Sequence, residues 1–479
     1  MKRFDSITFG TNGWRGLIAR DFTFANLRIV AQAIADYLKR ERQIPESPLA
    51  DRKPLVILGH DARFLGAELA LAAAEILEQN GLEPLLCDGP TPTPVISLLI
   101  RQKKAIGGLN LTASHNPATY QGIKFSTWEG TAASEEITSL LEAKIAELQK
   151  NGWSPEVKRP GEYQCATINP RELYFTEIKK FIDFEVLRKS SLSIAVELLY
   201  GAGRGYLDTL LEEAGVRIYR LNDETNPLFG GRRPEPSEEG MADARALVLE
   251  GKASLGLGLD GDADRFGVVD SDGSFMDPNK VLALTLYHLV KNKGWTGSVV
   301  RTAPTSHLVD AVAYIYGVKV HETPVGFKYI GALMESEPVI VGGEESGGLS
   351  VKGHVPEKDG ILANLLIAEL VAKEERSLQA ILKEIQDKAG YFYTDRINIF
   401  IAPEKKEGIL KLLEAGLDKI GSFKVQSLNR VDGFKFLLPE GEWVAFRASG
   451  TEPVFRCYIE TRTQAHLEEL KAACQELLK

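Results

Sequence analysis

The stretch DGDADR places three aspartates, Asp260, Asp262 and Asp264, two residues apart between two apolar runs. In an extended backbone, side chains two apart point to the same side, so the three carboxylates can face one ion. An EF-hand loop begins with the same spacing, but it needs Gly at position six and Glu at position twelve, where this chain has Arg265 and Ser271. The flanking apolar runs and Arg265 argue against an exposed acidic turn. Oxygen ligands favour Mg²⁺ over zinc, so we expect one Mg²⁺ per chain.

The stretch LTASHNPATYQG, residues 111–122, presents a hydroxyl that is a candidate nucleophile, that of Ser114. Ser, Asn and Pro are also ordinary turn residues, and no GxSxG sequence or base-and-orienter triad accompanies this serine. On its own Ser114 is therefore either a nucleophile or a turn residue. Together with a carboxylate triplet and phosphate-binding loops, it favours phosphoryl transfer through Ser114. His115 is the one histidine of the seven that falls in a candidate site.

Two further loops carry side chains suited to phosphate and sugar. FRASGTEPVFR combines a guanidinium, hydroxyls and a glycine, which together suit a phosphate cradle or, alternatively, a plain β-turn. VGGEESGGLS supplies carboxylates and a hydroxyl that suit sugar hydroxyls, although a polar loop is the simpler interpretation. The residues concerned are Arg447, Ser449, Gly450 and Thr451 in the first loop and Glu344, Glu345 and Ser346 in the second.

Single charged residues in four other stretches are weaker candidates, because a lone Lys or Arg is more often a solvated surface residue. Several follow a predicted strand, and open α/β sheets bind ligands at the ends of their strands. These residues are Arg15 in FGTNGWRG, Asp61 and Arg63 in GHDARF, Lys328 in TPVGFKYIG and Lys358 in PEKDGIL.

Composition narrows the class of protein. The chain has 479 residues, 44% hydrophobic and 26% charged, and a net charge of −9. This charge disfavours nucleic acid and anionic membranes as partners. Four scattered cysteines without a CxxC pair argue against a disulfide framework or a structural zinc site. The N-terminus lacks an apolar core of signal-peptide length, and no apolar run reaches bilayer length, so we expect a cytoplasmic protein.

The order of predicted elements indicates an α/β protein of several domains. Residues 22–41 read as a helix with Thr23 as its N-cap, and the βαβ rhythm that follows implies a mostly parallel sheet. The same rhythm restarts near residues 192 and 297, whereas the last segment reads as an antiparallel sheet with helices on one side. We expect domains at 1–160, 161–275, 276–390 and 391–479. GAGRG, residues 201–205, is interpreted as a tight structural turn.

The motifs together resemble the phosphohexomutases, a family that moves a phosphate between C6 and C1 of a hexose. TASHNP, DGDADR, GEESGG and RASGTEP occur in the family's order over nearly the whole chain, and FGTNGWRG, TPVGFK and EKDG are also similar to family stretches. The resemblance implies three similar α/β domains with mixed sheets and a C-terminal α+β domain around a central cleft. It also implies sugar phosphates as substrates and glucose 1,6-bisphosphate as activator and intermediate.

The resemblance also implies residue roles. Ser114 carries the phosphoryl group and joins the three aspartates around Mg²⁺, while Lys124, His115 and Arg15 complete the catalytic group. The implied contacts to substrate are Arg265, Lys328, Glu344, Ser346, Lys358, Arg447, Ser449, Gly450 and Thr451.

The chain departs from the family pattern at Gly348, where many bacterial members that accept both glucose and mannose phosphates have a histidine. GEES with EKDG is more similar to glucose-preferring mutases, and it makes Lys358 and Lys124 the candidates for proton transfer. We therefore expect a glucose-preferring mutase, with mannose phosphate as a further substrate, in a monomer or homodimer. The competing interpretations are a phosphoglucosamine mutase, a glucose 1,6-bisphosphate synthase and a non-catalytic sugar-phosphate binding protein.

Overall fold

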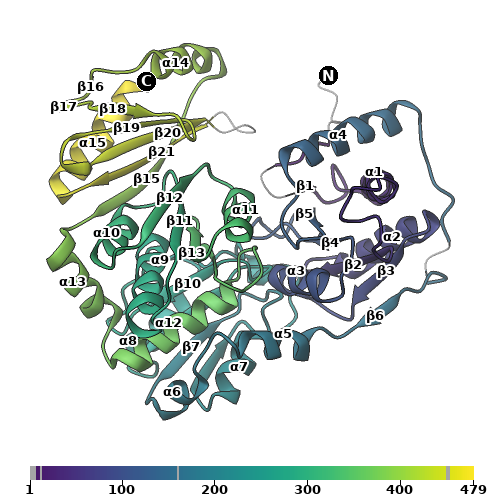
Figure 1. Ribbon diagram of the computed structural model, residues 1–479, viewed down its shortest axis with the longest axis horizontal. Coiled ribbons are helices and arrows are strands. Elements are labelled where there is room, and N and C mark those ends of the chain that lie inside the picture. Colours follow the sequence, from purple (N-terminus) through teal and green to yellow (C-terminus); the bar gives the residue numbers. More distant parts are fainter. Residues whose placement is uncertain (1–6, 11–12, 159–160, 449–453, 479) are drawn as a thin grey trace.

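The computed structural model describes residues 7–10, 13–158, 161–448 and 454–478. These residues form four larger β-sheets along the chain, three of mixed direction and a C-terminal one that is antiparallel, which is the predicted four-domain α/β architecture (Figure 1). Among the described residues, no helix combines the length and the apolar character that crossing a bilayer requires.

The first sheet has six strands in the order β1-β5-β4-β2-β3-β6, and its central strands β2, β3 and β4 are parallel. The predicted helix is present as α1: its apolar face is buried, and the side chain of Thr23 caps its first turn by accepting from Asn26 N. The strands are β1 (Trp14–Leu17), β2 (Leu55–His60), β3 (Glu83–Cys87), β4 (Gly107–Leu111), β5 (Tyr120–Thr127) and β6 (Ala166–Ile168), and the helices are α1 (Phe24–Arg42), α2 (Gly66–Gln79), α3 (Thr93–Gln102) and α4 (Glu135–Lys150).

The second sheet runs β10-β9-β7-β8, with β7 parallel to both β8 and β9, and β10 antiparallel to β9. Its strands are β7 (Ser193–Glu197), β8 (Arg217–Leu221), β9 (Leu255–Leu259) and β10 (Phe266–Val269). The helices of this part of the chain are α5 (Arg171–Ile178), α6 (Phe184–Lys189), α7 (Leu207–Glu213), the 3₁₀ turn η1 (Phe229–Gly231) and α8 (Ala242–Leu249).

The third sheet repeats this plan in the order β12-β11-β13-β14, with parallel β12, β11 and β13 and an antiparallel β14. Its strands are β11 (Ser298–Thr302), β12 (Lys319–Thr323), β13 (Val339–Glu344) and β14 (Gly348–Val351). The helices are α9 (Pro278–Tyr287), the π-helical turn η2 (His288–Asn292), α10 (Leu308–Ile315), α11 (Phe327–Ser336), α12 (Gly360–Glu374) and α13 (Leu378–Ala389).

The fourth sheet is antiparallel throughout, in the order β15-β21-β20-β19-β18, as the sequence predicts. Its strands are β15 (Tyr393–Phe400), β18 (Ser427–Asn429), β19 (Phe434–Leu437), β20 (Trp443–Ala448) and β21 (Val454–Thr461). Beside it lie the short pair β16 (Lys419–Ile420) and β17 (Phe423–Lys424), the turn η3 (Pro439–Gly441) and the helices α14 (Pro403–Ala415) and α15 (Gln464–Leu477).

The apolar cores do not follow the sheets one to one. The first and fourth sheets each have a core of their own, whereas one continuous core joins the second and third sheets. Helix α12 lies in this shared core, and its residues from Gly360 to Val371 are buried on every side. Strand β6 follows residue 160 yet pairs with β3 of the first sheet. The domain boundaries at 160, 275 and 390 stay predictions.

Candidate active site

Three of the candidate loops occupy the same place in three sheets. Each joins a buried strand to its antiparallel neighbour: the Ser114 loop lies between β4 and β5, the aspartate loop between β9 and β10, and the GEESGG loop between β13 and β14. The RASGTEP loop similarly joins β20 to β21. In that loop Ser449, Gly450 and Thr451 lie outside the residues that the structure describes.

The serine and the aspartates meet although they belong to different sheets. Carboxylate oxygens of Asp260, Asp262 and Asp264 lie within 4.8 Å of one another, and all three side chains are buried. The Ser114 hydroxyl donates to Asp260 Oδ2 over 2.8 Å. Ser114 itself has a left-handed backbone with φ of 51°, which is uncommon for a residue with a side chain and marks a constrained turn.

Lysines partly balance this negative cluster. Lys124 Nζ lies 2.6 Å from Asp262 Oδ2 and 2.8 Å from Asp264 Oδ2, and Lys358 Nζ lies 3.2 Å from Asp264 Oδ2. Burial lowers the pKa of Lys124, but the two carboxylates outweigh burial and raise it above its ordinary value. Lys124 is therefore a cation at neutral pH, which limits its use as a proton acceptor while both aspartates are ionised.

The same residues fit a divalent cation. Asp262 Oδ1 and Asp264 Oδ1 are buried and have no hydrogen-bond partner among the described residues, although such oxygens are normally paired. Burial, Asp262 and Asp264 all raise the pKa of Asp260, so the third negative charge is poorly compensated. A cation beside these oxygens would supply the missing charge, and an all-oxygen donor set is the kind that hard cations bind. The buried aspartate triad could therefore hold a metal ion.

Arg15, Arg265 and His115 surround the cluster. Arg15 Nη1 donates to Asn116 Oδ1 over 2.8 Å, next to the serine loop, and Arg265 N donates to Asp260 Oδ1 over 3.1 Å. His115 Nδ1 lies 3.4 Å from Ser114 Oγ. Burial, followed by the charges of Arg265 and Arg15, pushes the pKa of His115 far below its usual range, so its ring is neutral at pH 7.

The GEESGG loop separates its two glutamates. Glu344 Oε1 accepts from Gly326 N over 3.0 Å, whereas Glu345 accepts from the Thr302 hydroxyl over 2.9 Å. The Ser346 hydroxyl lies 3.5 Å from Glu344 Oε2, which keeps both groups in one turn.

Lys358 occupies space beside the same loop. A Cβ atom on Gly348 would lie only 2.2 Å from Lys358 Cδ, so the lysine stem fills the position that a side chain at 348 would take. Any larger residue at 348 must therefore displace Lys358.

Lys328 and Arg447 are placed away from the aspartates. Lys328 Nζ pairs with Glu135 at the start of α4 over 2.9 Å. Arg447 Nε lies 2.8 Å from Asp432 Oδ2, and the same oxygen accepts from Val325 N over 2.8 Å. Asp432 thereby connects the C-terminal sheet to Val325, which lies just before α11, the helix that carries Lys328.

Sequence reasoning missed several members of the cluster. The Thr93 hydroxyl donates to Asp262 Oδ2 over 2.6 Å and in turn accepts from Asn110 Nδ2 over 2.9 Å. The sequence presents Arg63 only as a lone cation, yet its guanidinium is buried under the serine loop and donates to Ser114 O over 2.6 Å. No local motif marks Thr93 and Asn110, and the stretch GHDARF does not reveal that Arg63 binds the serine loop, because that loop lies about 50 residues further along the chain.

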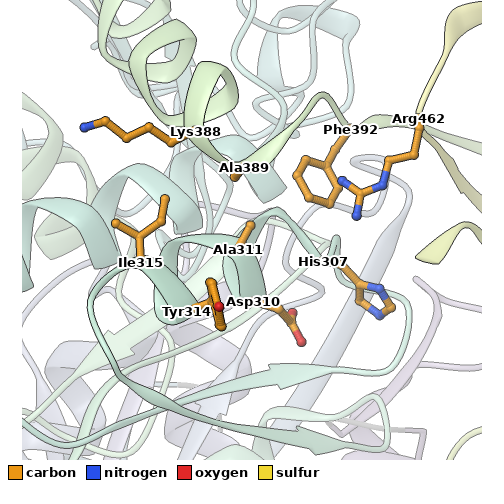
Figure 2. A pocket seen from close by; sticks show the side chains of 9 residues that line it. All are labelled: His307, Asp310, Ala311, Tyr314, Ile315, Lys388, Ala389, Phe392 and Arg462. Carbon is orange, nitrogen blue, oxygen red and sulfur yellow. The ribbon is translucent and has the colours of Figure 1, made fainter. Parts of the chain in front are cut away.

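A surface pocket lies apart from all these residues. Figure 2 shows it between α10, the end of α13 and the segment leading into β15, and Arg462 and Phe392 border it. None of the predicted site residues that the structure describes lines this pocket. In the aspartate cluster, by contrast, Lys124, Thr93 and Lys358 occupy the space beside the carboxylates.

Comparison with known proteins agrees with the motifs and the fold. Models of the phosphoglucomutase/phosphomannomutase family match the chain in sequence: alpha/beta/alpha domain I at residues 6–152, domain II at 172–273, domain III at 277–389 and the C-terminal domain at 397–477. A phosphoglucomutase/phosphomannomutase from Thermococcus kodakarensis is 30% identical, with 96% of each chain covered. A protein assigned as a phosphoglucosamine mutase, from Methanosphaera stadtmanae, is 29% identical, with 98% of each chain covered.

Solved structures give the same result. The crystal structure of a protein assigned as a phosphomannomutase, from Thermus thermophilus, superposes with a TM-score of 0.83 at 33% identity and covers 99% of both chains. The family models together span most of the 479 residues in the order of the four sheets. The chain belongs to the phosphoglucomutase/phosphomannomutase family, and it is a phosphohexomutase, an intramolecular phosphotransferase.

Proposed function

We propose that this phosphohexomutase interconverts hexose 1-phosphate and hexose 6-phosphate, with glucose phosphates preferred and mannose phosphates accepted. Ser114 is the residue that carries the phosphoryl group between the two half-reactions. The observation that carries this proposal is the 2.8 Å hydrogen bond from the Ser114 hydroxyl to Asp260, within a buried cluster of three carboxylates.

The metal in this proposal is Mg²⁺, which Asp260, Asp262 and Asp264 would hold together with Ser114. When bound, Mg²⁺ would neutralise the charge on the transferring phosphoryl group. The unpaired Oδ1 atoms of Asp262 and Asp264 support this ligand set, and a phosphate partner favours Mg²⁺ over zinc.

Charged side chains around Ser114 support the transfer step. Arg15 Nη1 bonds to Asn116 in the serine loop, and Arg265 Nε lies 4.0 Å from Asp264 Oδ1, so both guanidinium groups are placed to stabilise charge on the phosphoryl oxygens. Lys124 remains cationic beside Asp262 and Asp264, so we assign it an electrostatic role toward the reacting oxygens. Neutral His115, 3.4 Å from Ser114, orients the hydroxyl or its phosphate by hydrogen bonding.

Proton transfer at the sugar hydroxyl is assigned to Lys358. Its stem packs where a histidine at 348 would stand, and its ammonium lies 3.2 Å from Asp264.

The remaining loops are proposed to bind substrate. Glu344 and Ser346 bind the sugar hydroxyls. Lys328 contacts the same sugar ring, since it lies two residues after Gly326, whose amide donates to Glu344. The loop of Arg447, Ser449, Gly450 and Thr451 binds the phosphate that does not react. Because each end of the sugar reacts in turn, glucose 1,6-bisphosphate must rotate between the half-reactions, and this loop holds either phosphate.

The relatives favour a second candidate, a phosphoglucosamine mutase, because one that covers 98% of this chain carries that assignment. Gly348 with Lys358 supports the glucose preference instead. Two further candidates are a glucose 1,6-bisphosphate synthase and a non-catalytic sugar-phosphate binding protein. We further propose action in the cytoplasm as a monomer or homodimer; the four cysteines are free thiols.

Intact mass spectrometry and turnover assays test the proposal. Purified protein should carry one phosphate on Ser114, and glucose 1-phosphate should discharge it. Ser114→Ala should have no phosphate and no mutase activity, whereas Ser97→Ala, which removes a buried hydroxyl in α3, should keep both. Efficiencies with glucose, mannose and glucosamine phosphates would rank the sugars. Turnover by Ser114→Ala at the normal rate would overturn the proposal.

A further inference from the structure

Arg63 makes an unusual set of contacts beneath the serine loop. It follows β2, and its side chain is fully buried. Its Nη2 donates to the carbonyl oxygens of Ser114 and Asn116, each over 2.6 Å, and its Nη1 donates to those of Pro117 and Tyr120 over 2.8 and 3.0 Å. One guanidinium therefore binds four carbonyl groups, three in the serine loop and one, that of Tyr120, at the start of β5.

These carbonyls need such a partner. Three of them, those of Ser114, Asn116 and Pro117, lie between β4 and β5 and outside both strands, and of these Pro117 O also accepts from Tyr120 N over 3.0 Å. A buried carbonyl without a donor is costly, and the fork of donors on arginine can serve several acceptors at once. Lysine, a point charge with three donors, would reproduce only part of this arrangement.

The amide of Ser114 is tied to the same guanidinium. Ser114 N donates to the Thr112 hydroxyl over 2.8 Å, and that hydroxyl donates to Asp61 Oδ2 over 2.6 Å. Asp61 in turn accepts from Arg63 Nε over 3.0 Å. Both backbone polar groups of Ser114 thus belong to one closed network, which holds the residue in its left-handed conformation.

The network also lies at the contact between the first two sheets. The Arg63 guanidinium carbon is 4.9 Å from the centre of the Phe229 ring, which belongs to η1 beside the second sheet. A Cβ atom on Gly261, in the aspartate loop, would lie 2.6 Å from Ser114 O, so this loop packs directly on the carbonyl that Arg63 binds. The Ser114 carbonyl is therefore contacted both by Arg63 and by the aspartate loop, and these two contacts fix the position of Ser114 relative to Asp260.

We propose that Arg63, held by Asp61, is a positioning residue that sets the Ser114 hydroxyl at transfer distance from the aspartate cluster. This inference rests on the proposed role of Ser114 in phosphoryl transfer. Arg63 touches the loop backbone and not the Ser114 hydroxyl, so it acts through the geometry of the loop. A misplacement of about 1 Å can lower a rate about 100-fold, which is the scale of effect expected here.

The test compares Arg63→Lys, Arg63→Met and Thr112→Val with Glu369→Gln. Thr112→Val removes only the hydroxyl that accepts from Ser114 N, and it serves if the Arg63 variants do not fold. Glu369 is a buried carboxylate that pairs with Lys293 and His288 near α9, so its loss destabilises the protein without reaching the serine loop. Each variant is assayed for kcat, KM, Mg²⁺ affinity by calorimetry, thermal midpoint and phosphate on Ser114 after incubation with glucose 1,6-bisphosphate.

The expected result separates rate from binding. Arg63→Met should lose about 100-fold in kcat, Arg63→Lys and Thr112→Val less, with KM and Mg²⁺ affinity within about threefold of the parent. Phosphate loading of Ser114 should slow in the same order. Glu369→Gln should lower the thermal midpoint but keep kcat at temperatures where it is folded.

Two results would overturn the inference. One is a normal kcat in folded Arg63→Met or Thr112→Val. The other is that kcat, KM and Mg²⁺ affinity all worsen in proportion to the drop in thermal midpoint across the four variants. Failure of the proposed function is distinguishable, since it would appear as full turnover in Ser114→Ala regardless of position 63.

Discussion

The side chain of Lys358 lies against the bare backbone of Gly348, and a Cβ atom there would come within 2.2 Å of Lys358 Cδ. The two residues belong to different segments, the first to the turn before α12 and the second to the start of β14. Because Gly348 has no side chain, there is room for the stem of Lys358, whose ammonium group lies 3.2 Å from Asp264.

Gly348→Ala should therefore lower activity through Lys358. The new methyl group pushes the lysine stem away, and we expect kcat/KM for glucose 1-phosphate to fall at least about tenfold, which corresponds to about 1.4 kcal/mol of lost transition-state stabilisation. Lys358→Met should show a loss of similar or greater size, and steady-state kinetics with a coupled assay measures both.

Gly408→Ala is the matched control for that substitution. Gly408 lies in α14 with open space around its Cα, so the added methyl group meets no neighbour. It should leave the kinetics unchanged and stabilise the helix by about 0.5–1 kcal/mol. Normal activity of Gly348→Ala, with Lys358 still required, would contradict the steric argument.

Mg²⁺ should stabilise the folded protein through the aspartate triad. At a concentration about 100 times its Kd, binding to the native state alone adds about 2.7 kcal/mol to the free energy of unfolding. Denaturant titrations of chelator-treated protein with and without Mg²⁺ measure this difference.

Asp262→Ala should abolish most of that stabilisation and the activity, because it removes a ligand oxygen and leaves Lys124 with one carboxylate fewer. Asp272→Ala, at an exposed aspartate of the turn after β10, should keep both. Equal stabilisation of the parent and Asp262→Ala by Mg²⁺ would place the metal elsewhere.

Lys435 should make stability depend on pH in the alkaline range. It is buried between the third and fourth sheets, where it donates to Ala303 O over 2.7 Å and to Glu322 Oε2 over 3.0 Å, and His307, Arg301 and Glu460 also face it. Burial, with the nearby charge of Arg301, lowers the pKa of Lys435 to about 8.

Between pH 8 and the ordinary pKa of lysine, the unfolded chain binds more protons at this site than the folded one, so this contribution to stability rises with pH. The thermal midpoint of the parent should therefore gain relative to Lys435→Met as the pH rises from about 7 to about 9.5. Lys411→Met, which removes an exposed lysine, should show the same change of thermal midpoint with pH as the parent. Parallel pH curves for the parent and Lys435→Met would show that this site does not titrate in that range.

Arg447→Ala should impair binding more than chemistry. If the loop after β20 holds the phosphate that does not react, loss of its guanidinium raises KM for glucose 1-phosphate by at least about tenfold, since a charged hydrogen bond contributes about 1.5–3 kcal/mol. Initial-rate measurements over a wide substrate range separate KM from kcat.

Arg430→Ala is the control that tests whether loss of any positive charge near the fourth sheet raises KM. Arg430 donates to Glu414 O at the surface, so its loss should leave KM unchanged. A KM for Arg447→Ala equal to that of the parent would show that Arg447 does not bind the substrate phosphate.

Much of the architecture follows from local patterns. The apolar stripe from Leu27 to Leu38 and the Thr23 cap predict α1, and alternating apolar residues near the C-terminus predict the antiparallel sheet. Such patterns are readable because periodicity and capping depend on residues within a few positions of one another. The shared core of the second and third sheets was not predicted, because burial of α12 on every side depends on two sheets meeting around it.

The sequence by itself determined which chemical groups are present and at which strand ends they stand: Ser114 after β4, the three aspartates after β9 and Glu344 at the end of β13. Only the tertiary structure decided which of them meet. It joined Ser114 to Asp260 across 146 residues, placed Lys124 between two carboxylates, paired Lys328 with Glu135 and buried Arg63 under the serine loop. Contact between loops of different sheets depends on how their cores pack. Even the three aspartates converge in the turn between β9 and β10, where Ala263 has a φ of 56°, and not along the extended backbone that their spacing predicted.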